Sequence, residues 1–136
     1  RAERAIAEAY AADERRSPEE AVEAYVHALF DFLAGDQEFV ALIQRESLGD
    51  GHRVVAFLGR LADGAVAIFT PAAERAGATT QRLVLDLVAL CWYPLAHERT
   101  LLPALRMDPR EPAFREQHKR HLTDVVRALT RARDEG

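Results

Sequence analysis

Hydrophobic side chains recur every three to four positions along most of the chain, which is the spacing of an amphipathic α-helix. No stretch alternates strictly between apolar and polar residues, as a half-buried strand would. The pattern therefore predicts an all-α fold of about six helices in a single domain, residues 1–136. The helices are expected over residues 1–12, 17–34, 36–47, 52–76, 80–97 and 112–130, with a short helical turn at 101–105.

Capping residues mark the start of the second predicted helix. Ser17 can cap it, Pro18 fits the first turn, and Glu20 completes a capping box three residues after Ser17. Gly35 and Gly77 are typical of the position just after a helix.

Two prolines fall inside predicted helices. Pro71 should kink the fourth helix, and Pro94 should bend the fifth. Because proline has no N–H, Pro94 also frees the carbonyl of Leu90, which then needs another donor or a water molecule.

The fifth predicted helix is apolar on all sides. Leu83 and Leu87 share one face, and Val88 and Trp92 share the other. A helix of this kind must be covered on both sides. The pattern favours a homodimer in which residues 80–97 and 112–131 form an intersubunit four-helix bundle, although a central helix of a monomer would also satisfy it. The expected interface residues are Leu85, Val88, Trp92, Phe114, His118, His121, Leu122, Val125 and Leu129.

Polar residues of the fifth helix fall in one narrow arc. Asp86, Tyr93 and His97 share it, and Arg82 lies four residues before Asp86, where the two can pair. If this arc points inward, it forms the wall of a closed, largely apolar cavity with a few polar groups. Tyr93 or His97 would then hold the polar end of a mostly apolar ligand. The expected ligand-binding residues are Phe30, Phe39, Ile43, Glu46, Phe57, Leu61, Phe69, Asp86, Leu90, Tyr93 and His97.

Glu46 lies on an apolar stripe, where an unpaired carboxylate would be costly. It is either a ligand contact, a structural partner of an arginine such as Arg82, or a helix-end side chain turned to solvent; the structural readings are favoured. His118 and His121 share a helix face, and neutral rings at a dimer interface are favoured over a metal site.

Three further residues with reactive or ionisable side chains are interpreted as structural. His27 and Asp31 lie opposite the apolar face of their helix and are interpreted as surface residues. Cys91 is interpreted as a core residue. No metal ligand set and no cofactor are expected.

Composition narrows the function classes. The net charge of −4 and the scattered basic residues argue against nucleic-acid binding by this chain alone. A single cysteine allows no internal disulfide, which fits the cytoplasm. The sequence is read as having no apolar run of about 20 residues, so no membrane span is expected. No catalytic motif is present, so an enzyme is not expected.

Four stretches resemble the C-terminal domain of the tetracycline-repressor (TetR) family of bacterial transcription regulators. They are "ERAIAEAYA", "FVALIQRESLGDG", "WYPLAHERTLL" and "DPREPAFREQHKRHLTDVVRAL". The resemblance covers nearly the whole chain but is one of pattern, without a single diagnostic motif. It implies a homodimer built on the last two long helices and a small-molecule pocket in each subunit.

The resemblance also implies an N-terminal helix-turn-helix domain that reads a palindromic operator. That domain is absent from this sequence, and Arg1 falls within what would be the connecting helix. The chain is therefore expected to be the effector-binding and dimerisation domain of a cytoplasmic regulator, expected to be a repressor, that contacts operator DNA only through the missing domain. The alternatives are a small all-α enzyme that uses Asp86, Tyr93 and His97, and a purely structural helical dimerisation module.

Overall fold

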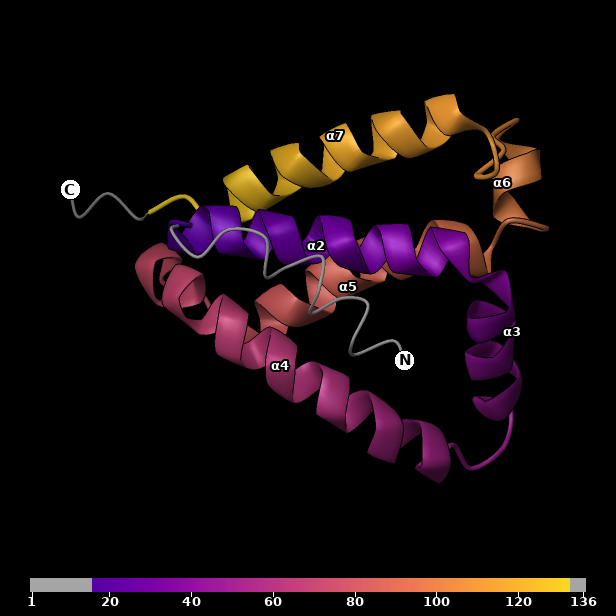
Figure 1. Ribbon diagram of the computed structural model, residues 1–136, viewed down its shortest axis with the longest axis horizontal. Coiled ribbons are helices and arrows are strands. Elements are labelled where there is room, and N and C mark those ends of the chain that lie inside the picture. Colours follow the sequence, from indigo (N-terminus) through magenta and orange to yellow (C-terminus); the bar gives the residue numbers. More distant parts are fainter. Residues whose placement is uncertain (1–15, 133–136) are drawn as a thin grey trace.

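The computed structural model describes residues 16–132, and in this range it contains helices and no strands, which confirms the all-α fold (Figure 1). The predicted helix at residues 1–12 lies outside the described residues. The helices are α2 (Pro18–Gly35), α3 (Gln37–Glu46), α4 (His52–Ala76), α5 (Thr80–Ala96), α6 (Leu101–Ala104) and α7 (Pro112–Leu129).

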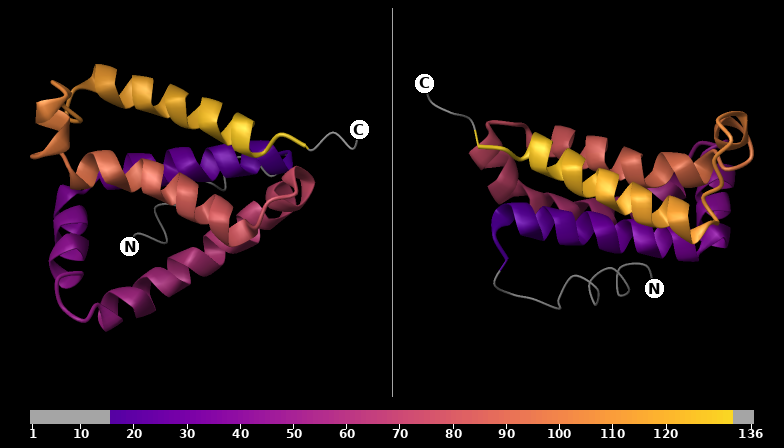
Figure 2. Two further views of the ribbon diagram at one scale, coloured as in Figure 1. Left: turned by 180° about the vertical axis from the view of Figure 1, so that it is seen from behind. Right: turned by 90° about the horizontal axis from the view of Figure 1, so that it is seen from above.

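Two central helices organise the fold. α2 packs against α3, α4, α5 and α7, and α5 packs against α2, α3, α4 and α7. In Figure 1, α7 and α4 flank α2 on opposite sides, and α3 stands across one end. Figure 2 shows from above that α7 lies over α2 and α5. The fully buried side chains of the core include Val22, Val26, Phe30, Phe69, Leu87, Cys91, Leu122 and Val126.

The ends of α2 are held by side chains. The Ser17 hydroxyl accepts a hydrogen bond from the backbone N–H of Glu20 at 3.2 Å, which confirms the predicted N-cap. At the other end, the guanidinium of Arg115 donates to the carbonyl oxygens of Ala34 at 3.1 Å and Pro109 at 3.2 Å. Arg115 thus ties α7 and the loop before it to the C-terminus of α2.

α5 is largely covered within its own subunit. Leu83, Leu87 and Cys91 are buried, and Val88 and Trp92 are partly buried against the same core. Val88 and Trp92, which were expected at the dimer interface, are therefore partly covered by their own subunit. The strip that stays exposed lies further round the helix and consists of Leu85, Ala89 and Tyr93.

His27 is not a surface residue, which corrects the interpretation from the sequence. Its Nε2 donates to the carbonyl oxygen of Lys119 at 3.1 Å and lies 2.9 Å from Thr123 Oγ1. Asp31 is exposed and pairs with Lys119 Nζ at 2.8 Å. α7 covers this side of α2, and the periodicity of α2 alone does not show that a second partner lies there.

More than half of the residues of α4 are exposed. By length and composition it could cross a membrane, with a mean hydropathy of 1.5 over a window of which 17% is buried. Arg60 and Asp63 interrupt its apolar sequence. Its outer side includes Val55, 69% exposed, and Leu58, 39% exposed. Length and composition alone assign no membrane contact to this helix.

Candidate ligand-binding site

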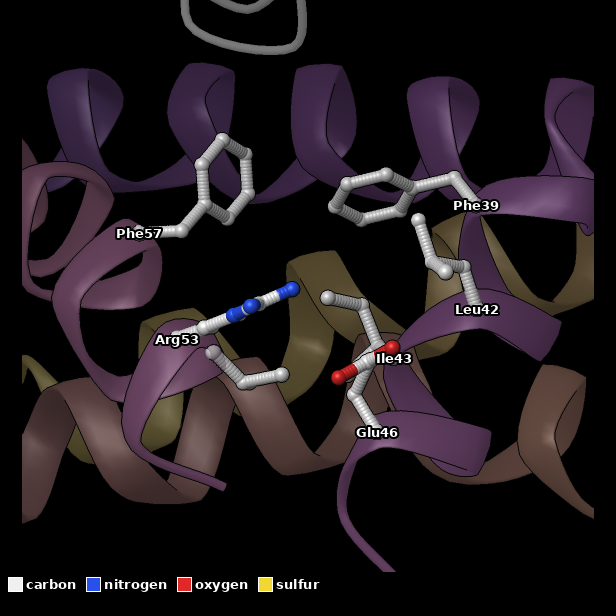
Figure 3. Close-up of a pocket in the computed structure, with 7 residues that line it drawn as sticks. Phe39, Leu42, Ile43, Glu46, Arg53 and Phe57 are labelled. Carbon is white, nitrogen blue, oxygen red and sulfur yellow. The ribbon is translucent and has the colours of Figure 1, made fainter. Parts of the chain in front are cut away.

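An open hollow of about 380 Å³ lies between α3 and the first turns of α4 (Figure 3). Its surface is almost entirely apolar, with two charged side chains at its edge. The lining residues are Phe39, Leu42, Ile43 and Glu46 from α3, and Arg53, Val54 and Phe57 from α4.

The hollow follows from helix periodicity on both sides of one turn. Phe39, Ile43 and Glu46 are three to four residues apart, so they share one face of α3, and Arg53 shares a face of α4 with Phe57. The Asp36 carboxylate accepts a hydrogen bond from the N–H of Phe39 at 3.0 Å and so fixes the start of α3.

The turn after α3 lets the two faces meet. The connecting residues 47–51 end at Gly51, whose φ of 74° lies in the left-handed region that glycine adopts without strain. The first turns of α4 therefore lie next to α3, and the helix then runs obliquely away from it (Figure 1).

Aromatic rings form one wall of the hollow. The ring centroids of Phe39 and Phe57 are 5.9 Å apart, with an interplanar angle of 61°. Phe32 from α2 supports Phe39 from behind, with centroids 5.2 Å apart and an angle of 73°. The guanidinium carbon of Arg60 lies 5.7 Å from the centroid of Phe57. These edge-to-face contacts hold the rings in defined positions.

Glu46 and Arg53 supply the charge at the hollow. Figure 3 shows the guanidinium of Arg53 and the carboxylate of Glu46 directed over the hollow from its two sides. No ion pair joins them, and within residues 16–132 no ion pair or side-chain hydrogen bond is found for either. Glu46 is exposed and does not pair with Arg82, whose Nε lies 3.5 Å from Asp86 as the i, i+4 spacing predicted.

Four of the expected ligand-binding residues meet at this hollow: Phe39, Ile43, Glu46 and Phe57. Phe30 and Phe69 are fully buried in the core. Leu61 is half-buried, one turn beyond Phe57. The hollow opens to solvent, whereas a closed cavity was expected.

The polar arc of α5 faces away from the hollow, contrary to expectation. Asp86, Leu90 and Tyr93 line a separate groove between α5 and α7. Tyr93 is 49% exposed, and its ring centroid lies 4.1 Å from that of His97, which is half-buried at the end of the helix. A helical wheel shows which residues share a face but not which face meets the core.

Three lining residues were not expected: Leu42, Arg53 and Val54. Arg53 had a signal in the sequence, because it lies four residues before Phe57 and therefore on the same face of the helix. An arginine in the first turn of a helix is usually solvated. The spacing to Phe57 was therefore not enough to predict Arg53 as a ligand-binding residue.

The α5/α7 groove has a volume of about 530 Å³ and is mostly apolar. It is lined by Asp86, Ala89, Leu90, Tyr93 and Pro94 from α5, and by His118, His121, Val125 and Leu129 from α7.

His118 Nε2 donates to the carbonyl oxygen of Leu90 at 2.8 Å. This is the carbonyl that Pro94 leaves without a backbone donor, so the predicted need for another donor is confirmed. The His118 ring stacks on Phe114, with centroids 5.6 Å apart and an angle of 6°, and contacts Phe30 with centroids 4.8 Å apart. Burial lowers the pKa of His118, the Leu90 hydrogen bond opposes this effect, and the charge of His121 adds to it.

The expected interface residues of α7 separate into two sets. Leu122 is fully buried and Phe114 is 9% exposed, so both belong to the core of their own subunit. His121 and Leu129 are exposed, and Val125 is half-buried. The apolar stripe of α7 therefore has one flank against α2 and another along the groove, where a partner could reach it.

Cys91 is buried, as expected of a core residue, and its Sγ donates to the carbonyl oxygen of Val26 at 3.5 Å. Burial raises the pKa of its thiol to about 12. Within residues 16–132, no group of three or more His, Cys, Asp or Glu side chains could hold a metal ion.

Comparisons of this chain with protein-family models, with curated proteins and with solved structures found no match. The resemblance to the TetR family therefore stays a prediction from the sequence pattern.

Proposed function

We propose that this chain is the effector-binding and dimerisation domain of a TetR-type transcriptional regulator, and that it senses a small, mostly apolar molecule. The observation that carries the proposal is the open apolar hollow between α3 and α4. A concave apolar surface with a few converging polar groups is typical of a small-molecule site. Phe39 and Phe57 offer aromatic surface to such a ligand, and Glu46 and Arg53 offer polar contacts.

Binding fits this site better than catalysis. Among the residues that the structure describes, the ionisable side chains that line the hollow are Glu46 and Arg53. None of these described lining residues is a nucleophile placed beside a base. Asp86 and Tyr93, on which the alternative enzyme depended, line a different surface.

The exposed strip of α5 and the outer flank of α7 form the proposed dimer interface. Leu85 is 59% exposed, Tyr93 49% and Leu129 36%, and the groove between the helices is mostly apolar. Burial of this surface against a second copy would remove apolar area from water, which is favourable. A two-fold axis along the groove would bring α5 and α7 of both copies together as a four-helix bundle.

The two surfaces are connected through α4. α4 lines the hollow with its first turns and packs against α2 and α5 further along. A ligand that changes the packing of α4 against α5 could change the arrangement of the two subunits in the dimer. This requires that the ligand binds the two packing arrangements of α4 and α5 with different affinity. In the proposed regulator, which we place in the cytoplasm, this change would alter the spacing of DNA-reading heads supplied by an N-terminal domain.

Filling the hollow tests the proposed site. Leu42 lines it and is 44% exposed, so Leu42→Trp should occupy the space without unfolding the protein. Apolar aromatic molecules should raise the melting temperature of the unmodified chain through binding linkage and should not do so for Leu42→Trp. Leu48→Trp makes the same change at an 89% exposed position outside the hollow and serves as the control. No stabilisation of the unmodified chain, or equal stabilisation of both variants, would refute the site.

A charge on the exposed strip tests the dimer. Leu85→Glu should shift the dimer–monomer equilibrium towards monomer, because it would bury a carboxylate at the interface. Sedimentation measures the equilibrium, and Leu48→Glu is the matched control. A chain that is monomeric at micromolar concentration, or a Leu85→Glu variant that associates normally, would contradict the proposed interface.

A further inference from the structure

We propose that the hollow binds a ligand with an apolar body and a zwitterionic end, whose carboxylate contacts Arg53 and whose ammonium group contacts Glu46. The inference rests on the proposed ligand-binding function and names the chemical class of the ligand. A molecule with an α-amino carboxylate and an aromatic or branched apolar side chain has this chemistry.

The body of the ligand is defined by the apolar part of the hollow. Phe39, Leu42 and Ile43 line one side, and Val54 and Phe57 line the other. The available space of about 380 Å³ accommodates a one- or two-ring aromatic group. Such a group can meet the rings of Phe39 and Phe57 edge to face, as they already meet each other.

Arg53 defines the side of the hollow that attracts an anion. It lies in the first turn of α4, where the helix carries a partial positive charge. No acidic residue lies in that turn, but the Asp50 carboxylate just before it accepts a hydrogen bond from the His52 N–H at 3.2 Å and so already meets this helix end. The attraction for an anion therefore comes mainly from the Arg53 guanidinium, whose planar group can bind a carboxylate through two parallel hydrogen bonds.

Glu46 defines the side that attracts a cation. It is the last residue of α3, where the helix carries a partial negative charge. A ligand ammonium group between this carboxylate and the helix end would be favoured by both.

Each of the two side chains has the charge that its own helix end disfavours. A glutamate at a C-terminus and an arginine at an N-terminus both destabilise the free helix. The two nevertheless face each other over the hollow without forming an ion pair (Figure 3). A zwitterion between them compensates both side chains at once, whereas a ligand with one charge is attracted by one side chain and repelled by the other.

Four probes with the same indole ring test the inference on the full chain. Tryptophan carries both charges, indole-3-propionate only the carboxylate, tryptamine only the ammonium group, and 3-methylindole neither. Calorimetric titration should give the tightest binding for tryptophan, by roughly tenfold over either singly charged probe, as expected for one additional charge-assisted contact.

Two neutralising variants assign the contacts. Arg53→Gln should weaken tryptophan and indole-3-propionate by roughly tenfold and spare tryptamine, and Glu46→Gln should weaken tryptophan and tryptamine and spare indole-3-propionate. Arg45→Gln and Glu38→Gln make the same changes at exposed positions of α3 outside the hollow and should leave all four affinities unchanged.

The outcomes separate this inference from the proposed function. Equal affinity for the four probes, with no effect of either variant, would overturn the zwitterionic ligand and leave an apolar ligand site in place. If each single variant instead destabilises the free protein and improves binding of 3-methylindole, Arg53 and Glu46 pair with each other, and the inference fails. Binding of none of the probes at millimolar concentration would refute the hollow as a ligand site and the proposed function with it.

Discussion

The hydrogen bond from His118 to the Leu90 carbonyl should contribute measurably to folding, because Pro94 removes the backbone donor that this carbonyl would otherwise have. The bond is 2.8 Å long and partly buried. His118→Leu keeps an apolar side chain beside Phe30 and Phe114 but removes the donor. We expect the free energy of unfolding to fall by about 1 to 3 kcal/mol, the typical cost of leaving such a group unpaired. Partial access of water to the carbonyl favours the lower half of this range.

A double-mutant cycle isolates the hydrogen bond from the packing of the ring. Pro94→Ala restores an N–H four residues after Leu90, so the carbonyl regains its helical partner. In that background, His118→Leu should cost about 1 kcal/mol less than in the unmodified protein. The remaining loss would report the contacts of the imidazole ring with Phe30 and Phe114.

Urea denaturation at pH 7.5 measures all four members of the cycle, provided that the slope of the transition stays constant. Arg120→Leu is the control, because Arg120 is exposed on the same helix and does not line the groove, so its loss should change the free energy of unfolding little. An equal cost of His118→Leu with and without Pro94 would refute the reasoning, since it would show that the Leu90 carbonyl does not depend on His118.

Two further predictions follow from the shifted pKa values. Because the pKa of His118 in the folded protein lies below its ordinary value of 6.5, the folded state binds fewer protons than the unfolded state in that interval. The contribution of His118 to the free energy of unfolding should therefore be complete above about pH 6.5 and should be lost as the pH falls through the pKa of the folded state. Urea titrations at several pH values should show this loss in the unmodified protein and not in His118→Leu. Identical pH profiles of the two proteins would contradict the prediction. The Cys91 thiol, buried and with its pKa raised to about 12, should resist a thiol reagent at pH 8 in the native protein and react at the rate of unfolding; rapid labelling in water would show that it is accessible.

Helix positions could be predicted from the sequence because their signals are local. Helix ends are marked by interactions within one turn of backbone, so they can be located without knowledge of the fold. Examples are the capping box at Ser17, the left-handed conformation of Gly77 and the cap at Asp36. The predicted range 52–76 coincides with α4, and the other described helices end within about two residues of their predictions. The need of the Leu90 carbonyl for another donor was also visible, because proline lacks an N–H in every fold.

The sequence did not show which residue donates to the Leu90 carbonyl. It also did not show which face of each helix points toward the core. His118 reaches that carbonyl from a position 28 residues away in sequence. His27 was assigned to the surface and is half-buried under α7, while Tyr93 was assigned to the interior and is exposed. Periodicity gives the angles between side chains around one helix but contains no information about which neighbour covers each face.

The candidate site was predictable in the same partial way. Phe39, Ile43, Glu46 and Phe57 could be selected because apolar stripes and an out-of-place carboxylate are properties of single helices. That Glu46 faces Arg53, and that α5 contributes nothing to the hollow, depends on how the turn before Gly51 sets α4 beside α3. The sequence by itself determined the helices, their caps and their apolar stripes, because these depend on residues within a few positions of one another. Only the tertiary structure decided which stripes meet, because that depends on the packing of all the helices at once.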